Sequence, residues 1–234
     1  WHAGGSHSTA RTRPRLPFGW NREGGARVGL VDRADPDRPP VWHEVDPCWV
    51  FHPLNAYDTP DGGVVVDVCQ FDRVIDQDRT GPGDPFPPQL WRWEIDGRGG
   101  VVRRTCIDDR IQEFPRPDER FWGRRHRFGL TGELLSRNAT ASLLVHDLDA
   151  GTAQSWEAEA GHSLSEAVFV PASPTAGEGE GWALAVESNT STSRLRIFAA
   201  TDVSSGPVAT VELPQRIPDA STAAGCHSIA ASRD

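Results

Sequence analysis

Short runs in which apolar and polar residues alternate make up most of the chain. Examples are "VWHEV" at 41–45, "GGVVVDVCQF" at 62–71 and "GWALAVES" at 181–188. Most runs have roughly five to eight residues, end at Gly, Pro, Asp or Ser, and recur every 10 to 14 residues or so, as β-strands do. No stretch keeps a helical period beyond about two turns. The pattern predicts an all-β fold.

The remaining predicted strands follow the same rule. In chain order they cover 26–33, 90–96, 101–108, 141–149, 153–160, 166–171, 193–200 and 208–214. Alternation alone fits a sandwich, a barrel or a propeller. Turn-rich excursions such as "DQDRTGPGDPFPPQ" at 76–89 favour the propeller, because they resemble long loops on one face. At about 40 to 45 residues per four-stranded blade, the chain could supply at most about five blades.

Composition excludes some function classes. The chain of 234 residues carries 24 basic and 33 acidic residues, for a net charge of -9. Such a balance repels a phosphate backbone, so nucleic acid is not expected to be the main partner. The four cysteines (Cys48, Cys69, Cys106 and Cys226) form no C-x-x-C pair. Scattered free thiols of this kind are typical of a cytoplasmic protein.

The two ends of the chain differ from the rest. Residues 1–13 are small, polar and without period, and we interpret them as a disordered or non-native leader. No apolar run reaches the roughly 18 residues that a membrane span needs. Residues 219–234 also lack the strand pattern.

His52 is the first candidate for chemistry. It follows Val50 and Phe51 and precedes Pro53, which cannot donate a ladder hydrogen bond, so we predict that a strand ends there. By itself it fits a buried histidine with an ordinary partner. The polar residues that follow, Asn55, Tyr57 and Asp58, favour a functional site instead.

Two glutamates stand beside apolar strands in the same way. Glu113 opens the stretch "EFPRPDERFWGRRHRFGL" at 113–130, whose arginines are expected to form a solvated, salt-bridged loop. Glu166 precedes the apolar run of "SEAVFVP" at 165–171. Each glutamate alone fits an exposed strand end.

Taken together, three segments resemble one family. The segments "PCWVFHPLNAYD" (47–58), 113–130 and 165–171 are similar, in order and spacing, to motifs of the carotenoid cleavage oxygenases. That family includes the bacterial lignostilbene dioxygenases and the vertebrate retinoid isomerase of the pigment epithelium. The resemblance covers about residues 14–218.

The resemblance implies a fold and a reaction. The family fold is a seven-bladed β-propeller, of which residues 14–218 would form about the C-terminal half. Members hold Fe(II) with four histidines, three of them steadied by glutamates. They use O2 to cleave a C=C bond of a carotenoid, apocarotenoid or stilbene into carbonyl products. On this resemblance His52 is the third metal ligand, Glu113 supports it, and Glu166 supports the fourth ligand.

The sequence departs from the family at both ends. The first two ligands would lie upstream of Trp1, so the missing N-terminal half is needed for a complete site. The fourth belongs to a Phe-His-Gly-x-Trp motif expected shortly after residue 218. His227 is the only histidine there and lies about five positions late, so it matches the motif poorly. We interpret 219–234 as the product of a reading-frame slip, which the encoding DNA would test, and expect this chain alone to be inactive.

A second reading from another class stays open at this stage. The chain could be a non-catalytic β-propeller or β-sandwich binding module without iron, in which His52, Glu113 and Glu166 are ordinary core or surface groups. The distance between His52 and Glu113 separates the two readings. A separation of about 2.6 to 3.2 Å favours the metal site.

Overall fold

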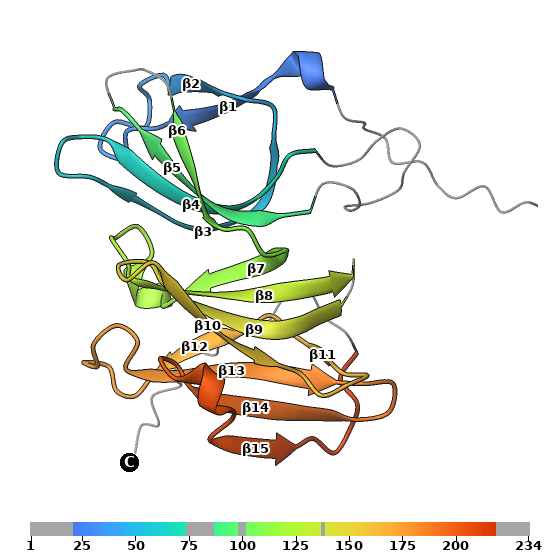
Figure 1. Cartoon of the computed structure of the whole chain (residues 1–234). Coiled ribbons are helices and arrows are strands. Elements are labelled where there is room, and N and C mark those ends of the chain that lie inside the picture. The colour runs from blue at the N-terminus through green and yellow to red at the C-terminus, as the bar shows by residue number, and fades with distance from the viewer. Residues whose placement is uncertain (1–20, 74–86, 98–101, 137–138, 219–234) are drawn as a thin grey trace, which may run out of the picture.

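The computed structural model describes residues 21–73, 87–97, 102–136 and 139–218 (Figure 1). The predicted leader 1–13, the tail 219–234 and His227 lie outside these residues. The described part contains strands and three short 3-10 helices, η1 (Arg22–Gly24), η2 (Glu119–Phe121) and η3 (Val203–Ser205). None of its helices is long and apolar enough to span a membrane.

The strands alternate with short turns along the chain. They are β1 (Ala26–Leu30), β2 (Val41–Val45), β3 (Trp49–Asp58), β4 (Val64–Phe71), β5 (Gln89–Ile95), β6 (Arg103–Asp108), β7 (Gln112–Pro117), β8 (Phe128–Ser136), β9 (Ala139–Asp147), β10 (Thr152–Glu157), β11 (Ser163–Leu164), β12 (Val168–Pro171), β13 (Gly181–Ser188), β14 (Ser193–Ala199) and β15 (Ala209–Glu212).

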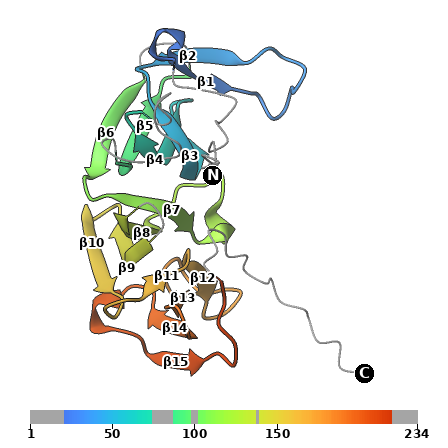
Figure 2. The ribbon, with the colours of Figure 1, turned by 90° about the vertical axis from the view of Figure 1, so that its right-hand side faces the viewer.

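The described strands pair antiparallel and form three sheets. β1 pairs with β2, and β3-β4-β5-β6 form a four-stranded meander. The third sheet follows the order β15-β14-β13-β11-β9-β8-β7, with β10 added beside β9 and β12 beside β13. Short β11 joins its two halves, since Leu164 pairs with both Thr140 and Glu187. Both views show the sheets in a row, from β1–β2 to β13–β15 (Figures 1 and 2).

The described part is all-β, as the alternation predicts, and its row of antiparallel sheets agrees with the partial propeller that the resemblance implies. The predicted strands at 41–45 and 181–188 have the observed bounds of β2 and β13. The prediction that a strand ends at His52 is wrong. β3 continues to Asp58, and Pro53 pairs with Val68. Proline is tolerated there because β3 is the edge strand of its sheet and is bulged on both sides of Pro53.

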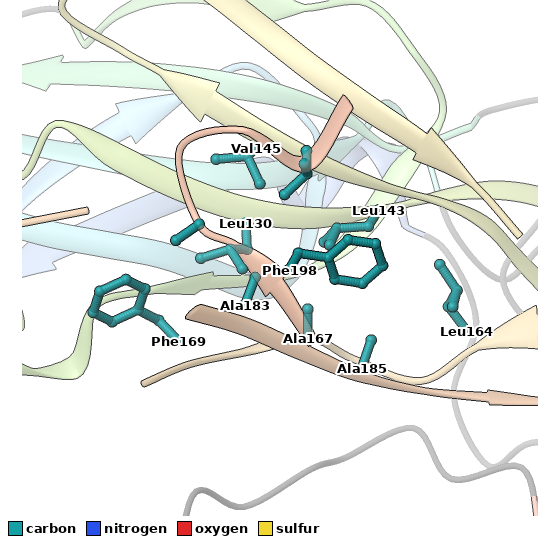
Figure 3. Close-up of a cluster of buried hydrophobic side chains, with 11 residues drawn as sticks. Leu130, Leu143, Val145, Leu164, Ala167, Phe169, Ala183, Ala185 and Phe198 are labelled. Atoms are coloured by element: carbon teal, nitrogen blue, oxygen red, sulfur yellow. The ribbon is translucent and has the colours of Figure 1, made fainter. Parts of the chain in front are cut away.

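The largest apolar core lies in the third sheet. Leu130 of β8 and Leu143 and Val145 of β9 face Phe198 of β14, which is fully buried (Figure 3). Small residues such as Ala183 of β13 are buried in the same cluster. A second core, including Val68 and Trp93, lies between the four-stranded sheet and the β1–β2 hairpin.

The sheets meet where β3 approaches β7 and β8. Leu54 of β3 is buried with Cys69 and Leu90. Gly129 of β8 lies so close that a Cβ there would be 2.7 Å from Leu54 Cδ2. Cys69, like Cys48 and Cys106, is a free thiol. This junction positions the residues of the candidate site.

Candidate functional site

His52 projects from a bulge in β3. Val50 pairs with Gln70 and Pro53 with Val68, so β3 gains one residue relative to β4 at this point. A bulge bends the strand and redirects the side chains it carries. The His52 side chain is about half exposed, at 51%, although Leu54 and Asn55, which follow the bulge, are buried.

Glu113 lies at a matching bulge in β7. It pairs with Gly132, whereas Arg116 pairs with Leu130, so three steps along β7 match two along β8. The extra residue places Glu113 and Arg116 on the same side of the strand, which simple alternation forbids. Phe114, inside the bulge, adopts a left-handed backbone with φ 57°. Such a conformation is strained for a non-glycine residue.

The two bulges bring His52 and Glu113 into direct contact. Nδ1 of His52 donates to Oε2 of Glu113 at 2.7 Å, and the Glu113 side chain is only 5% exposed. The backbone N–H of Phe114 donates to the same oxygen at 2.7 Å. A carboxylate only accepts, so Nδ1 carries the proton, and in the neutral ring Nε2 is the nitrogen with a free lone pair. The other Glu113 oxygen, Oε1, is buried without a hydrogen-bond partner among the described residues.

The surroundings of the ring are aromatic and acidic. The ring centroids of Phe51 and Phe114 lie 6.3 and 5.8 Å from that of His52. The hydrogen bond to Glu113 raises the pKa of His52, partial burial lowers it, and the charge of Glu166 adds a smaller increase. Glu166 therefore lies near enough to act on the same imidazole.

Glu166 is held by an arginine. Nε of Arg116 donates to Glu166 Oε1 at 2.6 Å, and Nη1 of Arg116 donates to Glu119 at 3.1 Å. All three side chains are largely buried, with exposures of 11 to 16%. Sequence reasoning missed Arg116 as a site residue, because the bulge that turns it toward Glu166 cannot be read from alternation. The proline at 115 was the available signal, since proline inside a strand marks a bulge or an edge.

The arginines of 113–130 divide into two groups. Arg124, Arg125 and Arg127 are exposed, as expected for a solvated loop. The same expectation is wrong for Arg116 and Arg120, which are more than two thirds buried against Glu166 and Asp118. Arg116 donates to Glu166 and Arg120 to the carbonyl of Ala176, so both side chains hold this segment against neighbouring parts of the fold.

Of the polar residues after His52, Asn55 is buried, Tyr57 is partly buried and Asp58 is exposed. Tyr57 packs edge-on against the buried ring of His126, with centroids 5.9 Å apart. Burial lowers the pKa of His126, so that ring is neutral near pH 7. The contact with His126 thus holds Tyr57, and with it the end of β3, against the rest of the fold.

A complete metal centre is not formed by the described residues alone. Within them no group of three or more His, Cys, Asp or Glu side chains is arranged to hold a metal ion. What they offer is one imidazole with its Nδ1 fixed by a buried carboxylate. This is the form in which histidine binds metals through Nε2.

Comparisons with known proteins agree with the motifs. Residues 7–220 match the family described as retinal pigment epithelial membrane protein. The carotenoid cleavage oxygenase of Mycobacterium tuberculosis is 36% identical over 214 residues, which is 87% of this chain and 43% of that protein. The isoeugenol monooxygenase of Pseudomonas nitroreducens is 30% identical over 233 residues, 91% of this chain and 48% of that protein.

Solved structures share the fold. A variant of the Synechocystis apocarotenoid oxygenase has a TM-score of 0.74 at 25% identity, over 83% of this chain and 42% of that one. The lignostilbene dioxygenase of Pseudomonas brassicacearum has a TM-score of 0.78 at 23% identity, over 86% of this chain and 46% of that one. The chain thus spans less than half the length of these relatives.

Proposed function

The chain belongs to the retinal pigment epithelial membrane protein family, and from this membership we propose that it is part of an oxygenase that cleaves a C=C bond with O2. The relatives named for carotenoids, apocarotenoids and isoeugenol support an oxidative reaction on an unsaturated, apolar substrate. Carotenoid, apocarotenoid and stilbene substrates all fit this class. The products would be carbonyl compounds.

One observation carries the proposal, the 2.7 Å hydrogen bond between His52 and Glu113. A binding module without a metal would not need a half-exposed imidazole braced by a buried carboxylate. The brace fixes the tautomer and makes Nε2 a better electron-pair donor. The contact therefore favours the metal-site reading over the binding-module reading.

Fe(II) is the metal that we propose for this site. His52 would bind it through Nε2, and Glu113 would orient His52 without touching the metal. Imidazole suits iron, and a bound Fe(II) would supply the activation of O2 toward an electron-rich double bond. The remaining ligands would come from outside the described residues, and Glu166 would steady one of them.

The free cysteines and the net charge bear on the location of the protein and on its partners. Free thiols such as Cys48, Cys69 and Cys106 persist in a reducing compartment, which supports a cytoplasmic protein. The net charge of -9 argues against nucleic acid as the main partner.

A chimera tests the function directly. Residues 21–218 would replace the matching region of the Mycobacterium tuberculosis relative, which keeps its own residues before and after the exchange. The purified, iron-loaded chimera would be given O2 and an apocarotenal or a hydroxystilbene, and aldehyde products would be measured. We expect cleavage, and we expect His52→Ala to remove it by loss of bound iron.

A second chimera provides the control for the C-terminal tail. It ends with residues 219–234 of this chain in place of the relative's own terminus, and we expect it to bind less iron. A folded first chimera that retains iron but cleaves none of these substrates would contradict the proposed reaction.

A further inference from the structure

Asn55 is buried three residues after His52, and its side chain is bonded to one loop. Its Nδ2 donates to the backbone carbonyls of Phe121 and Arg124, both at 3.0 Å. Its Oδ1 accepts from the backbone N–H of Gly123 at 3.1 Å. A single carboxamide therefore binds one turn of the loop through both its donor and its acceptor.

The loop is a direct continuation of the strand that carries Glu113. β7 ends at Pro117, and η2 (Glu119–Phe121) follows after Asp118, whose side chain caps it. On its far side the loop is fixed as well, because Nη1 of Arg120 donates to the carbonyl of Ala176 at 2.8 Å. Asn55 thus joins β3 to a segment that is already held in place.

Asn55 also contacts a buried polar network formed by His126, Asp67 and Arg92. Its Nδ2 lies 3.1 Å from Nδ1 of His126, and the His126 side chain is fully buried. Next to His126 lies Asp67, also fully buried, which accepts from Nε and Nη2 of Arg92 at 2.7 and 2.8 Å. Nε2 of His126 lies 3.6 Å from Asp67 Oδ2 and has no hydrogen-bond partner among the described residues. Breaking the remaining contacts of this buried network would leave more polar groups unpaired, so they resist displacement.

The site strands need such a clamp. Pro53 and Pro115 cannot donate ladder hydrogen bonds, and each lies in a bulge beside a site residue. The left-handed backbone of Phe114 persists only where surrounding contacts hold it in place. Leu54 against Gly129, and the backbone bridge between Tyr57 and Gly123, also join the two sheets. Asn55 adds side-chain hydrogen bonds to this junction, three residues from His52.

We propose that Asn55 is a positioning residue, whose carboxamide clamps the 121–124 loop to β3 and thereby keeps His52 Nδ1 hydrogen-bonded to Glu113. The inference rests on the proposed function, because it concerns the same imidazole. It assigns the Asn of the "HPLN" stretch a task of its own, separate from metal binding.

Long-range 1H–15N NMR of the metal-free, 15N-histidine-labelled chain tests this clamp, with His52→Ala to assign the signal. In the unmodified chain we expect His52 to be protonated on Nδ1. In Asn55→Ala we expect His52 to populate both tautomers. We expect its Nδ1 proton to exchange with water about tenfold faster or more. A folded Asn55→Ala protein with an unchanged His52 signal and exchange rate would overturn the inference.

Asn189→Ala is the matched control. Asn189 Oδ1 accepts from the backbone N–H groups of Ser191 and Thr192 at 2.8 Å in the β13–β14 turn. Its loss removes a comparable loop anchor, so we expect a lower unfolding midpoint with an unchanged His52 signal. An equal change of the His52 signal in this variant would show that any loop destabilisation suffices and would also overturn the inference.

Gly123→Ala loosens the clamp from the loop side and serves if Asn55→Ala does not fold. Gly123 has φ +74°, and a Cβ there would meet only Arg33 Nη1, at 3.9 Å. The backbone strain of an alanine at this φ stays local to the loop. We expect a smaller shift of the His52 tautomer and of the Nδ1 exchange rate, in the same direction as in Asn55→Ala. No change in either quantity would reject the clamp. Because no metal or substrate is used, failure to bind iron would count against the proposed function alone.

Discussion

The Glu113 carboxylate determines which nitrogen of His52 carries the proton. Its Oε2 accepts from Nδ1 at 2.7 Å, and its other nearby donor is the backbone N–H of Phe114. Glu113 is nearly fully buried, whereas His52 is half exposed. This combination fixes the ring and leaves its other edge accessible.

Replacing Glu113 by Gln tests how the carboxylate acts on His52. Because the hydrogen bond to Glu113 is the largest cause of the raised pKa of His52, we expect Glu113→Gln to lower that pKa toward its ordinary value. In the unmodified chain the charged pair contributes stability that is fully present below about pH 6.5 and is lost as pH rises through the raised pKa.

An NMR pH titration of the His52 ring protons measures the change. Glu119→Gln is the control, because Glu119 binds Arg116 and not His52. An equal pKa in the Glu113→Gln and unmodified proteins would contradict the assigned cause.

His146 gives a second pH-dependent prediction. Its buried ring lies 2.9 Å from Gln112 Oε1 and 3.0 Å from Thr131 Oγ1, and burial lowers its pKa to about 4. The unfolded chain therefore binds more protons than the folded one between about pH 4 and 6.5. His146 should make the unfolding free energy rise by roughly 3 kcal/mol over this range and add no slope above it.

Urea unfolding at several pH values checks this slope. His146→Gln lacks the titrating group, so we expect its unfolding free energy to vary less between pH 4 and 6.5. Parallel pH profiles for the two proteins would contradict the prediction.

At the scale of strands, alternation predicts regular elements and fails at bulges. β2 and β13 were predicted to the residue because each is regular and ends at turn residues. β3 was predicted to end at His52 and no strand was predicted at β7, because Pro53 and Pro115 lie inside these strands rather than at their ends. His52 lies in β3 and Glu113 in β7. The alternation pattern therefore fails in the two strands whose bulges orient the site residues.

Buried charges link the outer strands of the third sheet. Glu187 of β13 is fully buried and accepts from Nε of Arg194, at 2.8 Å, and of Arg196, at 2.5 Å. We expect Glu187→Ala to lower the unfolding free energy by about 2 to 4 kcal/mol, since Arg194 and Arg196 would lose a buried partner and keep only the more exposed Glu159.

Glu94→Ala is the matched control in denaturant unfolding. It removes an exposed partner of Arg103 at 3.1 Å and should cost about 0 to 1 kcal/mol. Equal losses in the two variants would show that burial of Glu187 adds nothing.

At the scale of the molecule, the candidate site depends on contacts between sheets. His52 belongs to the four-stranded sheet and Glu113 to the third sheet, and Figure 1 shows β3 facing β7 across the junction. Residue spacing alone could not predict this contact, because 61 positions separate the two residues. Resemblance to a family supplied it. The Arg116–Glu166 pair was not predicted, because it requires the β7 bulge.

The isolated chain should be unable to carry out the proposed reaction. Its described residues supply a single braced imidazole, which we expect to bind ferrous iron too weakly to compete with solvent and buffer. We expect no aldehyde when the purified chain is mixed with Fe(II), O2 and an apocarotenal or a hydroxystilbene. Measurable aldehyde, lost in His52→Ala, would contradict this expectation.

Anaerobic Fe(II) titration of the 15N-histidine-labelled chain tests whether His52 binds iron through Nε2, because the paramagnetic ion broadens the nuclei nearest to it. We expect His52 Nε2 to broaden at a lower Fe(II) concentration than His162, another histidine that is not fully buried, while buried His146 stays sharp. Broadening of His162 with His52 unaffected, or a His52 ring protonated on Nε2, would contradict it.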